Sequence, residues 1–265
     1  MLSPELRAFA EAPDRYTQLS PDVERFADGR MCVLQGPTWA AVSGVRVAAE
    51  AVEALVAEVE GRVPAEKSTT WWLGPSAEPP DLVERLEALG FTDPPDHASL
   101  LYGLACATAP PPGPPEVDVR RVESLADFVV ARDLGWEAFE IAQERRDQEG
   151  PHLETFYEGM RNGGPIPFLA YLDGEPVGVG RSVRSPRGAF LIGGAVLPHA
   201  RGRGVYRALV RARWDDAVER GTPALVTEAI PDTSYPVLKR IGFVEVCAIR
   251  RLGGRAQGSR SSGGS

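Results

Sequence analysis

Cysteine is scarce in this chain of 265 residues. The three cysteines, Cys32, Cys106 and Cys247, stand alone, with no CxxC pair and no histidine at the spacing of a metal site. This pattern excludes a disulfide framework and a zinc motif, and it predicts buried thiols in a reducing compartment. We therefore expect the protein to use no metal.

Long apolar runs are missing as well. No stretch approaches the roughly 18 consecutive apolar residues that a membrane helix needs, and no apolar run follows a basic start as in a secretory signal. The sequence therefore predicts a cytoplasmic protein without a membrane partner.

The charge is uneven along the chain, whose formal net value is −8. Up to Gly113 there are 8 basic and 17 acidic residues, a net of −9, whereas the remainder carries 21 and 20, a net of +1. An acidic first half argues against a nucleic-acid surface. An anionic cofactor is expected on the nearly neutral second half.

A basic, glycine-spaced turn lies between an apolar strand that ends at Pro198 and an amphipathic helix. Gly202 and Gly204 lack side chains, so successive backbone N–H groups can converge on an anion there. Arg201 and Arg203 add positive charge, and the start of the following helix adds the positive end of its dipole. The segment therefore predicts a phosphate-binding loop.

The spacing Arg-x-x-Gly-x-Gly/Ala resembles the acyl-CoA pyrophosphate loop of the GNAT N-acetyltransferase superfamily. Arg201 and Gly204 match it, and Tyr206 stands where the family usually has Gly or Ala. A strand over residues 224–230, a helix over 234–241 and the pair Gly-Phe at 242–243 follow in the family's order. The resemblance covers residues 116–252. It implies acetyl-CoA (coenzyme A) as acyl donor, bound by Val196, Leu197, Arg201, Gly202, Arg203, Gly204, Val205 and Tyr206.

Residues 110–115, Pro-Pro-Pro-Gly-Pro-Pro, predict a stiff linker between two domains. The expected domains are residues 1–109 and the acyltransferase domain 116–252, and the polar tail 253–265 is expected to be disordered. Residues 86–91 align without gaps with residues 238–243, which suggests that the first domain is a degenerate GNAT-like copy of the second. A supporting domain of another kind stays the alternative. The expected fold class is α/β (α+β): a mixed, mostly antiparallel sheet with flanking helices of the GNAT type, in tandem.

Acyl transfer to an amine needs a base for the amine and an acid for the leaving thiol. The position where the family usually offers a tyrosine as acid is Leu238, and Ser234 and Tyr235 are the nearest hydroxyls. Glu228, in the strand beside the expected thioester, is the candidate base. A carboxylate in an apolar strand is either a base of raised pKa or one half of a buried pair with an arginine, and both interpretations stay open.

The acceptor site is expected on the two helices after the first strand of the second domain, where Trp136, Phe139 and Glu140 are the candidate substrate residues. Aromatic residues at helical spacing can equally form core, and the acidic residues can equally form a solvated face.

The sequence thus predicts an N-acetyltransferase, an acyltransferase that moves acetyl from acetyl-CoA to the amine of a small molecule. Two alternatives stay open. The missing family tyrosine is compatible with a non-catalytic CoA-binding or regulatory module, and Tyr206 is compatible with a GNAT-fold enzyme that uses another acyl donor or nucleophile. The acceptor and the oligomeric state, a homodimer included, are not determined by the sequence.

Overall fold

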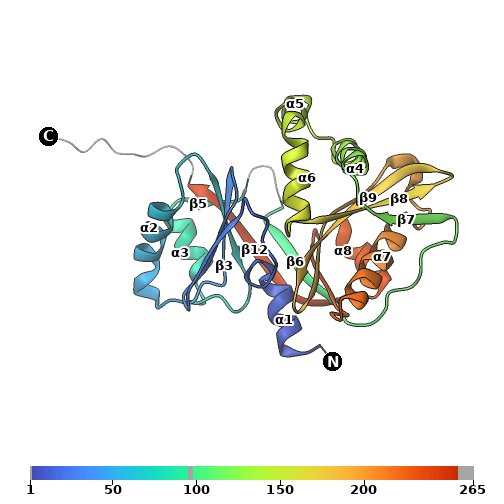
Figure 1. The fold of residues 1–265 in the computed structure, drawn as a ribbon. Coiled ribbons are helices and arrows are strands. Elements are labelled where there is room, and N and C mark those ends of the chain that lie inside the picture. The colour runs from blue at the N-terminus through green and yellow to red at the C-terminus, as the bar shows by residue number, and fades with distance from the viewer. Residues whose placement is uncertain (1, 95–97, 256–265) are drawn as a thin grey trace. The chain divides into compact units, whose positions relative to one another are not determined.

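The chain forms two compact units, here called unit 1 (Met1–Val23 and Tyr102–Cys247) and unit 2 (Glu24–Leu101 and Ala248–Ser265). The structure is a computed structural model that describes residues 2–94 and 98–255 (Figure 1). Each unit is described by itself.

Unit 1 contains a mixed, mostly antiparallel sheet with the strand order β6-β11-β10-β9-β8-β7. The strands are β6 (Leu100–Cys106), β7 (Val117–Arg121), β8 (Ile166–Leu172), β9 (Glu175–Ser185), β10 (Gly188–Val196) and β11 (Leu225–Ala229). Only the pair β10·β11 is parallel, because α7 (Val205–Glu219) connects these two strands as a crossover.

The helices of unit 1 cover both faces of this sheet. Apolar residues of α7 and α8 (Ser234–Ile241) share clusters with β6, β8, β10 and β11 on one face. On the other face, α4 (Leu125–Ala138) and α6 (Leu153–Arg161) pack on β8 and β9, and α1 (Pro4–Glu11) packs on β6, β10 and β11. The remaining elements are α5 (Gln143–Glu149) and the 3-10 turns η1 (Pro13–Arg15), η3 (Gly150–His152) and η4 (Pro198–Ala200).

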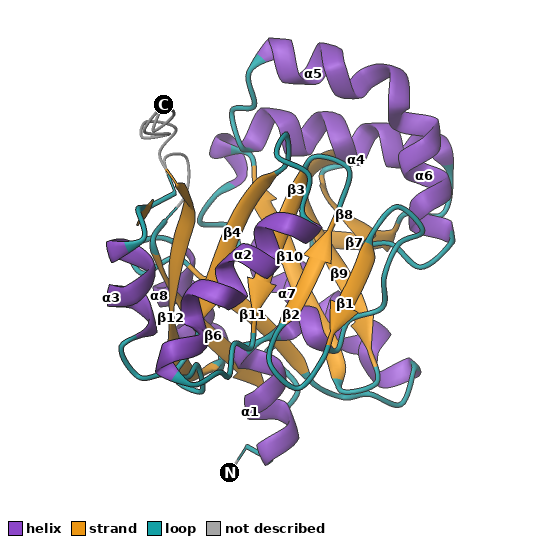
Figure 2. Cartoon of the chain, turned by 90° about the vertical axis from the view of Figure 1, so that its left-hand side faces the viewer, coloured by secondary structure: helices purple, strands orange, loops and turns teal. Residues whose placement is uncertain are grey.

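Unit 2 has the strand order β1-β2-β3-β4-β12, with β5 also paired to β12. Its elements are β1 (Glu24–Ala27), β2 (Cys32–Gln35), β3 (Trp39–Ser43), η2 (Ala49–Ala51), α2 (Val52–Arg62), β4 (Ser68–Leu73), α3 (Leu82–Ala88), β5 (Phe91–Thr92) and, from Ala248 on, β12 (Val244–Arg255). Apolar residues of α2 and α3 share one cluster with β2, β3 and β4, so both helices cover the same face, and Figure 2 shows α2 lying across these strands.

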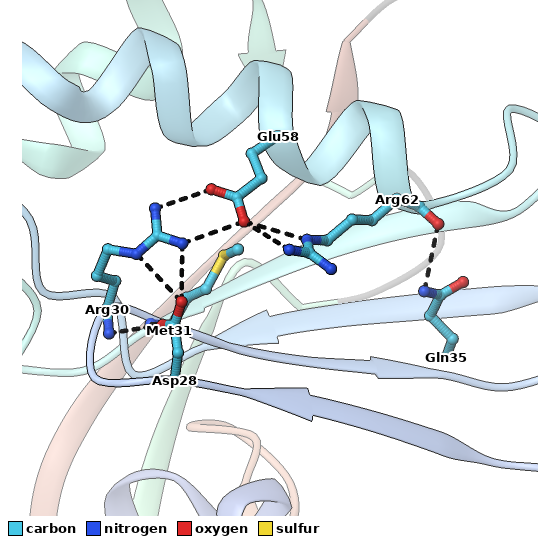
Figure 3. Close-up of polar contacts among 6 residues, drawn as sticks. All are labelled: Asp28, Arg30, Met31, Gln35, Glu58 and Arg62. Carbon is cyan, nitrogen blue, oxygen red and sulfur yellow. Dashed lines mark hydrogen bonds and ion pairs between the residues drawn. The ribbon is translucent and has the colours of Figure 1, made fainter.

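An ion-pair network fixes α2 to the turn between β1 and β2 (Figure 3). Arg30 bonds Asp28 at 2.7 Å and Glu58 at 2.8 Å, and Glu58 also accepts from Arg62 at 2.9 Å. Because these side chains are partly exposed, we attribute to them a role in orienting α2 rather than a large share of the stability.

The boundaries of the two units differ from the predicted domain boundaries 1–109 and 116–252. Residues 1–23 belong to unit 1 because Leu6 and Phe9 of α1 pack on Val226 of β11. Each sheet also takes a strand from the other half of the sequence. Residues 102–106 of β6 pair with β11 in unit 1, whereas Arg250 and its neighbours in β12 pair with β4 in unit 2.

The proline segment 110–115 lies within unit 1 and does not connect the two units, which corrects the predicted linker. The Pro110 carbonyl accepts from Arg211 of α7 at 3.1 Å. A Cβ on Gly113 would come within 2.3 Å of Ala208, so the segment packs directly against α7. A stiff polyproline segment without N–H donors suits this role, since it can lie along a helix without joining a sheet.

The predicted disordered tail 253–265 starts too early. Gly253 pairs with Thr70 of β4 and with Thr92 of β5, and Arg255 pairs with Phe91, so residues 253–255 continue β12. Residues 256–265 lie outside the described residues.

Candidate functional site

The parallel strands β10 and β11 diverge near their carboxyl ends. Their pairing runs from Ala189 with Leu225 to Leu191 with Thr227, although β10 continues to Val196. A β-bulge interrupts β10 between Ile192 and Ala195, and within it Gly193 has a φ of +54°. The bulge turns β10 away from β11 and so opens the sheet between the two strands.

The loop after β10 has the geometry of an anion-binding nest. Gly202 and Gly204 both have a φ of +77°, the left-handed region that a glycine adopts without strain. Gly204 is the N-cap of α7 and offers no side-chain oxygen, so no side chain caps the first N–H groups of the helix. A Cβ built on Gly202 would meet nothing within 4 Å. The loop can therefore present backbone N–H groups and the helix dipole to a phosphate.

The two arginines of the loop differ. Arg201 donates from Nε to the Val196 carbonyl at 3.1 Å, which ties the loop back to the end of β10. Arg203 is half-exposed and lies 3.7 Å from Asp173, a distance too long for a strong pair, so its guanidinium can turn to an anion.

The backbone groups expected to hold a pantetheine arm already have partners. Leu197 donates its N–H to the Val177 carbonyl at 2.9 Å and accepts from Ala200 at 3.0 Å. The Val196 carbonyl accepts from Arg201. Since a peptide oxygen has two lone pairs, both carbonyls keep one acceptor site, but the Leu197 N–H is used.

Tyr206 takes the place of the family's small residue, and the space for its ring comes from β10. A Cβ on Gly194 would lie 2.8 Å from Cε2 of Tyr206, so the ring fills the volume that a side chain at residue 194 would need. Val205 beside it is buried. The tyrosine ring therefore points into the interior beside Gly194 and does not cover the backbone N–H groups of the loop.

Arg213 lies on the buried side of α7, with only 1% of its surface exposed. It donates to the Leu209 carbonyl at 2.9 Å and to the Arg181 carbonyl at 3.3 Å. Burial lowers the pKa of Arg213, and the neighbouring Tyr206 hydroxyl counteracts this. Arg213 thus fixes α7 to β9, and the close approach requires Gly180, whose Cβ would lie 2.9 Å from the guanidinium carbon.

Glu228, the candidate base, follows directly after Thr227, the last β11 residue that pairs with β10. It is half-buried, lies opposite Gly103 of β6 and shares its sheet face with Val226. Burial, together with the nearby charges of Glu11, Glu228 and Glu245, raises the pKa of the Cys247 thiol to about 12. A neutral thiol therefore sits beside the carboxylate.

The two candidate hydroxyls have structural partners. Ser234 Oγ accepts from the Ile230 N–H at 2.9 Å and so closes the turn before α8. Tyr235 donates its hydroxyl proton to Glu245 at 2.6 Å and packs against the Tyr102 ring at 4.7 Å between centroids. The hydrogen bond to Glu245 raises the pKa of Tyr235, which holds the phenol protonated.

Trp136 is 9% exposed and donates from Nε1 to Glu149 at 3.1 Å. Glu149 also pairs with Arg145 at 2.9 Å and with Arg132. Burial acts to raise the pKa of Glu149, but the hydrogen bond from Arg145, the charge of Arg132 and the hydrogen bond from Trp136 together lower it. Trp136 is therefore part of the packing that joins α4 to α5.

Phe139 is 49% exposed at the end of α4, and Glu140 follows it with a φ of +52°, unusual for a residue with a side chain. The nearby hollow of about 390 Å³ includes Trp136 but neither Phe139 nor Glu140. Its lining residues all come from α4 and α5: Asp133, Trp136, Glu137, Gln143, Arg146 and Asp147. The three predicted substrate residues thus lie at or just after the end of α4, and of them only Trp136 lines this hollow.

Sequence reasoning missed Arg181, which lies in β9 opposite Ile192 at the start of the bulge. Its guanidinium packs against Gly193, whose Cβ would lie 2.7 Å from Nη2. Two signals were available: the glycine pair 193–194 inside an apolar strand, which marks a bulge, and a charge inside the otherwise apolar strand before it.

In the comparison with protein families, residues 130–243 match the Acetyltransferase (GNAT) family. No curated protein matches the chain. The matched stretch contains α7, the nest, the diverging strands and Arg181, so the predicted family resemblance is confirmed for this part of the chain.

Solved structures similar to the whole chain include a GCN5-related N-acetyltransferase from Kribbella flavida, 17% identical, with 96% of each chain covered and a TM-score of 0.66. A GCN5-related N-acetyltransferase from Sphaerobacter thermophilus is 16% identical over 85% of this chain and 80% of that one, with a TM-score of 0.57. A tandem GNAT protein from the clavulanic acid biosynthesis pathway is 15% identical over 97% and 89%, with a TM-score of 0.58. These likenesses concern the fold, and they confirm the predicted fold class.

Neither residues 2–94 nor residues 98–255 contain a group of three or more His, Cys, Asp or Glu side chains that could hold a metal ion. In the same part of the chain, no helix has the length and apolar character needed to span a membrane.

Proposed function

Because residues 130–243 carry a GNAT acetyltransferase domain, we propose that the protein is an acyl-CoA-dependent N-acetyltransferase that acts on the amine of a small molecule. The observation that carries the proposal is the nest at the start of α7, where Gly202 and Gly204 are both left-handed and no side chain caps the helix. Its position after the diverging strand β10 suits a donor whose phosphates bind at the nest and whose thioester enters between β10 and β11.

Acetyl-CoA supplies the acyl group, and the residues of the chain bind and orient it. Val196, Leu197 and the loop from Arg201 to Tyr206 hold the donor. The acceptor nitrogen forms a bond to the carbonyl carbon, the carbon–sulfur bond breaks, and CoA leaves as a thiolate. Glu228 takes the proton that the amine loses, and the thiolate takes a proton from a hydroxyl of the site or from water.

For the acid, Tyr235 is the better of the two candidate hydroxyls. Ser234 Oγ serves as an acceptor for the Ile230 N–H, whereas Tyr235 carries a proton in a 2.6 Å hydrogen bond to Glu245. Transfer of that proton would break the bond to Glu245. We therefore assign Ser234 a positioning role for α8 and propose Tyr235 as the proton donor.

A second candidate function is a non-catalytic CoA-binding module, because Leu238 stands where the family's tyrosine acid is expected and is buried in the core at 1% exposure. A third is transfer of another acyl group. The cytoplasmic setting stays a prediction of the sequence, and the oligomeric state, a homodimer included, stays open.

Titration calorimetry with acetyl-CoA, followed by detection of released CoA thiol with a panel of primary amines, tests these functions. We expect binding and release of CoA with at least one amine. Binding without release by any amine would favour the non-catalytic module, and preferential competition by longer acyl-CoAs would favour another donor. A chain that does not bind acetyl-CoA would contradict the proposal.

A further inference from the structure

The cationic side chain of Arg181 lies beside the β10 bulge. Arg181 is on the β9 face that α4 covers, next to Val179, which packs with Phe128 and Leu134 of that helix. Gly193 leaves room for the guanidinium, since a Cβ there would lie 2.7 Å from Nη2 and 2.9 Å from Nε of Arg181. The absence of a side chain at Gly193 in the bulge is therefore what makes room for the Arg181 guanidinium.

The surroundings of Arg181 do not neutralise it. The charged groups that act on Arg181 are Arg132 and Glu149, and Glu149 already accepts from Arg132, Arg145 and Trp136. Within residues 2–94 and 98–255, no side chain accepts a hydrogen bond from the Arg181 guanidinium. Burial, reinforced by the charge of Arg132, lowers the pKa of Arg181 to about 10, so it still carries its charge at neutral pH.

The backbone that carries Arg181 is held firmly. Its carbonyl accepts from the buried Arg213 at 3.3 Å, and β9 is paired on both sides, with Pro167 of β8 and Ile192 of β10 opposite Arg181. A guanidinium on a rigid strand is preorganised for a ligand, which reduces the entropy lost on binding.

Arg181 is not placed for the phosphates of the donor. From Gly193 to Leu197 the chain advances by roughly 13 Å at the usual rise of a strand, and the nest begins only after that. The guanidinium is also on the α4 face, whereas Tyr206 of the loop packs against Gly194 on the α7 face. The anion that suits Arg181 is thus a different one from the pyrophosphate.

Building on the proposed function, we propose that Arg181 binds a carboxylate of the acyl acceptor, so that the acceptor is an amine that also carries a carboxylate, such as an amino acid. A planar guanidinium matches a carboxylate with two parallel hydrogen bonds. One unpaired cation balances one carboxylate charge, whereas a doubly charged phosphate would need a second, and Arg132 is already paired with Glu149. Arg181 is therefore a specificity residue for the acceptor.

The test compares amino acids with the amines that remain when their carboxylate is removed, using the full chain and acetyl-CoA. The pairs are L-leucine with 3-methylbutylamine, L-lysine with cadaverine, and β-alanine with ethylamine, and the rate of CoA release gives kcat and KM. We expect at least one amino acid to exceed its amine by about 10-fold or more in kcat/KM, the usual value of a charge-assisted hydrogen bond. Arg181→Gln should abolish this preference by raising KM for the amino acid without changing KM for acetyl-CoA.

A binding measurement keeps the test independent of turnover. With CoA present, 4-methylpentanoate, which is leucine without its amine, should raise the melting temperature of the wild type and of Arg161→Gln, but not of Arg181→Gln. Arg161 is the matched control, since its side chain is 61% exposed and removal of it changes the net charge equally. Arg181→Lys should keep part of the effect.

Three outcomes would overturn the inference: no carboxylate preference in any pair, a preference that survives Arg181→Gln, or neither turnover nor a thermal shift with the carboxylates. Amines acetylated as fast as amino acids would contradict only the role of Arg181. A chain that neither binds acetyl-CoA nor releases CoA would contradict the proposed function itself.

Discussion

Each unit contains a connection of strand, helix and parallel strand. The two connections differ in how far the strands pair and in the turn before the helix, the two features on which binding of an anionic donor depends. In unit 2, β3 is followed by α2 and by β4, which runs parallel to β3. In unit 1, β10, α7 and β11 follow the same order. A short helix and an antiparallel strand come next in both halves of the sequence, α3 before β5 and α8 before β12.

The strands differ in their pairing. In unit 2 all of β3 pairs with β4, from Trp39 with Ser68 to Ser43 with Trp72. In unit 1 the pairing ends at Leu191 and Thr227, and β10 then bulges at Gly193. Only the unit 1 connection therefore leaves an opening that could admit a thioester.

The turns before the helices differ as well. In unit 2 the backbone groups of the turn bond Glu78, which follows β4: the Val47 N–H donates to the Glu78 carbonyl at 3.2 Å, and the Glu78 N–H donates to the Val45 carbonyl at 2.9 Å. Glu53 lies in the first turn of α2 and opposes an anion there, whereas the first turn of α7 has no acidic residue. The same order of strand, helix and parallel strand thus occurs with and without the features of a donor site. We propose that unit 2 is a degenerate copy that does not bind the donor.

The largest effect is expected at the opening itself. Glu228→Gln keeps the shape and hydrogen bonding of the side chain but cannot take a proton, so kcat should fall by about 100-fold while CoA affinity stays nearly constant. Glu53→Gln, the matched change in unit 2, should leave kcat unchanged. Full activity of Glu228→Gln with a lower melting temperature would show that the carboxylate is structural instead.

The next effect concerns the arginines of the nest. Arg201→Ala with Arg203→Ala should weaken CoA binding by about 30-fold, or roughly 2 kcal/mol, in calorimetry at low salt. Because Arg201 also holds the Val196 carbonyl, Arg203→Ala alone separates the charge from that contact. Arg46→Ala in the turn of unit 2 is the control. Unchanged CoA affinity in the double variant would place the donor elsewhere.

A smaller effect tests how the bulge accommodates Tyr206. Gly194→Ala should lower the free energy of unfolding by about 1–2 kcal/mol, since the new Cβ would crowd the ring. Adding Tyr206→Leu should restore most of this loss, as measured by urea denaturation. Gly135→Ala, in a helix where a Cβ has room, should not destabilise. If Gly194→Ala lowered the free energy of unfolding equally in the wild type and in Tyr206→Leu, the ring of Tyr206 would not be what occupies the space beside Gly194.

The smallest effect is expected on CoA affinity when a left-handed glycine is replaced by alanine. Two such glycines distinguish the cost of backbone strain from a loss of anion binding. Gly202 and Gly221 lie before and after α7, have φ values of +77° and +74°, and both have open space where a Cβ would lie. Either change to alanine should cost about 1 kcal/mol of stability, but only Gly202→Ala should weaken CoA, by about 5-fold. Equal CoA affinities of the two variants would argue against the nest. Gly204 is less suitable, because a Cβ there would also meet Pro114 at 2.6 Å.

The sequence predicts the local features well. The nest, α7 and α8 depend on glycine positions and helical periodicity within short windows, and these are visible in the chain itself. The exchange of β6 and β12 between the two halves was missed because strand pairing depends on partners more than 100 residues away. Glu228 pairs with Gly103 in this way.

Where the structure departs from expectation near the site, the causes are similar. Residues 110–115 were interpreted as a linker from their local stiffness, although their place is set by packing on α7. Trp136 was proposed for the substrate, but its indole N–H bonds Glu149, a partner that periodicity does not indicate. Arg181 was overlooked because alternation in β9 does not tell which charged residue faces α4.

The contrast between the two connections can be tested most directly by amide hydrogen–deuterium exchange of the full chain with and without acetyl-CoA. We expect protection of the amides of residues 201–207, whose N–H groups form the nest, and no change over residues 44–53, the corresponding stretch of unit 2. Protection of residues 44–53, or none at 201–207 under saturating acetyl-CoA, would contradict the assignment of the donor site to unit 1.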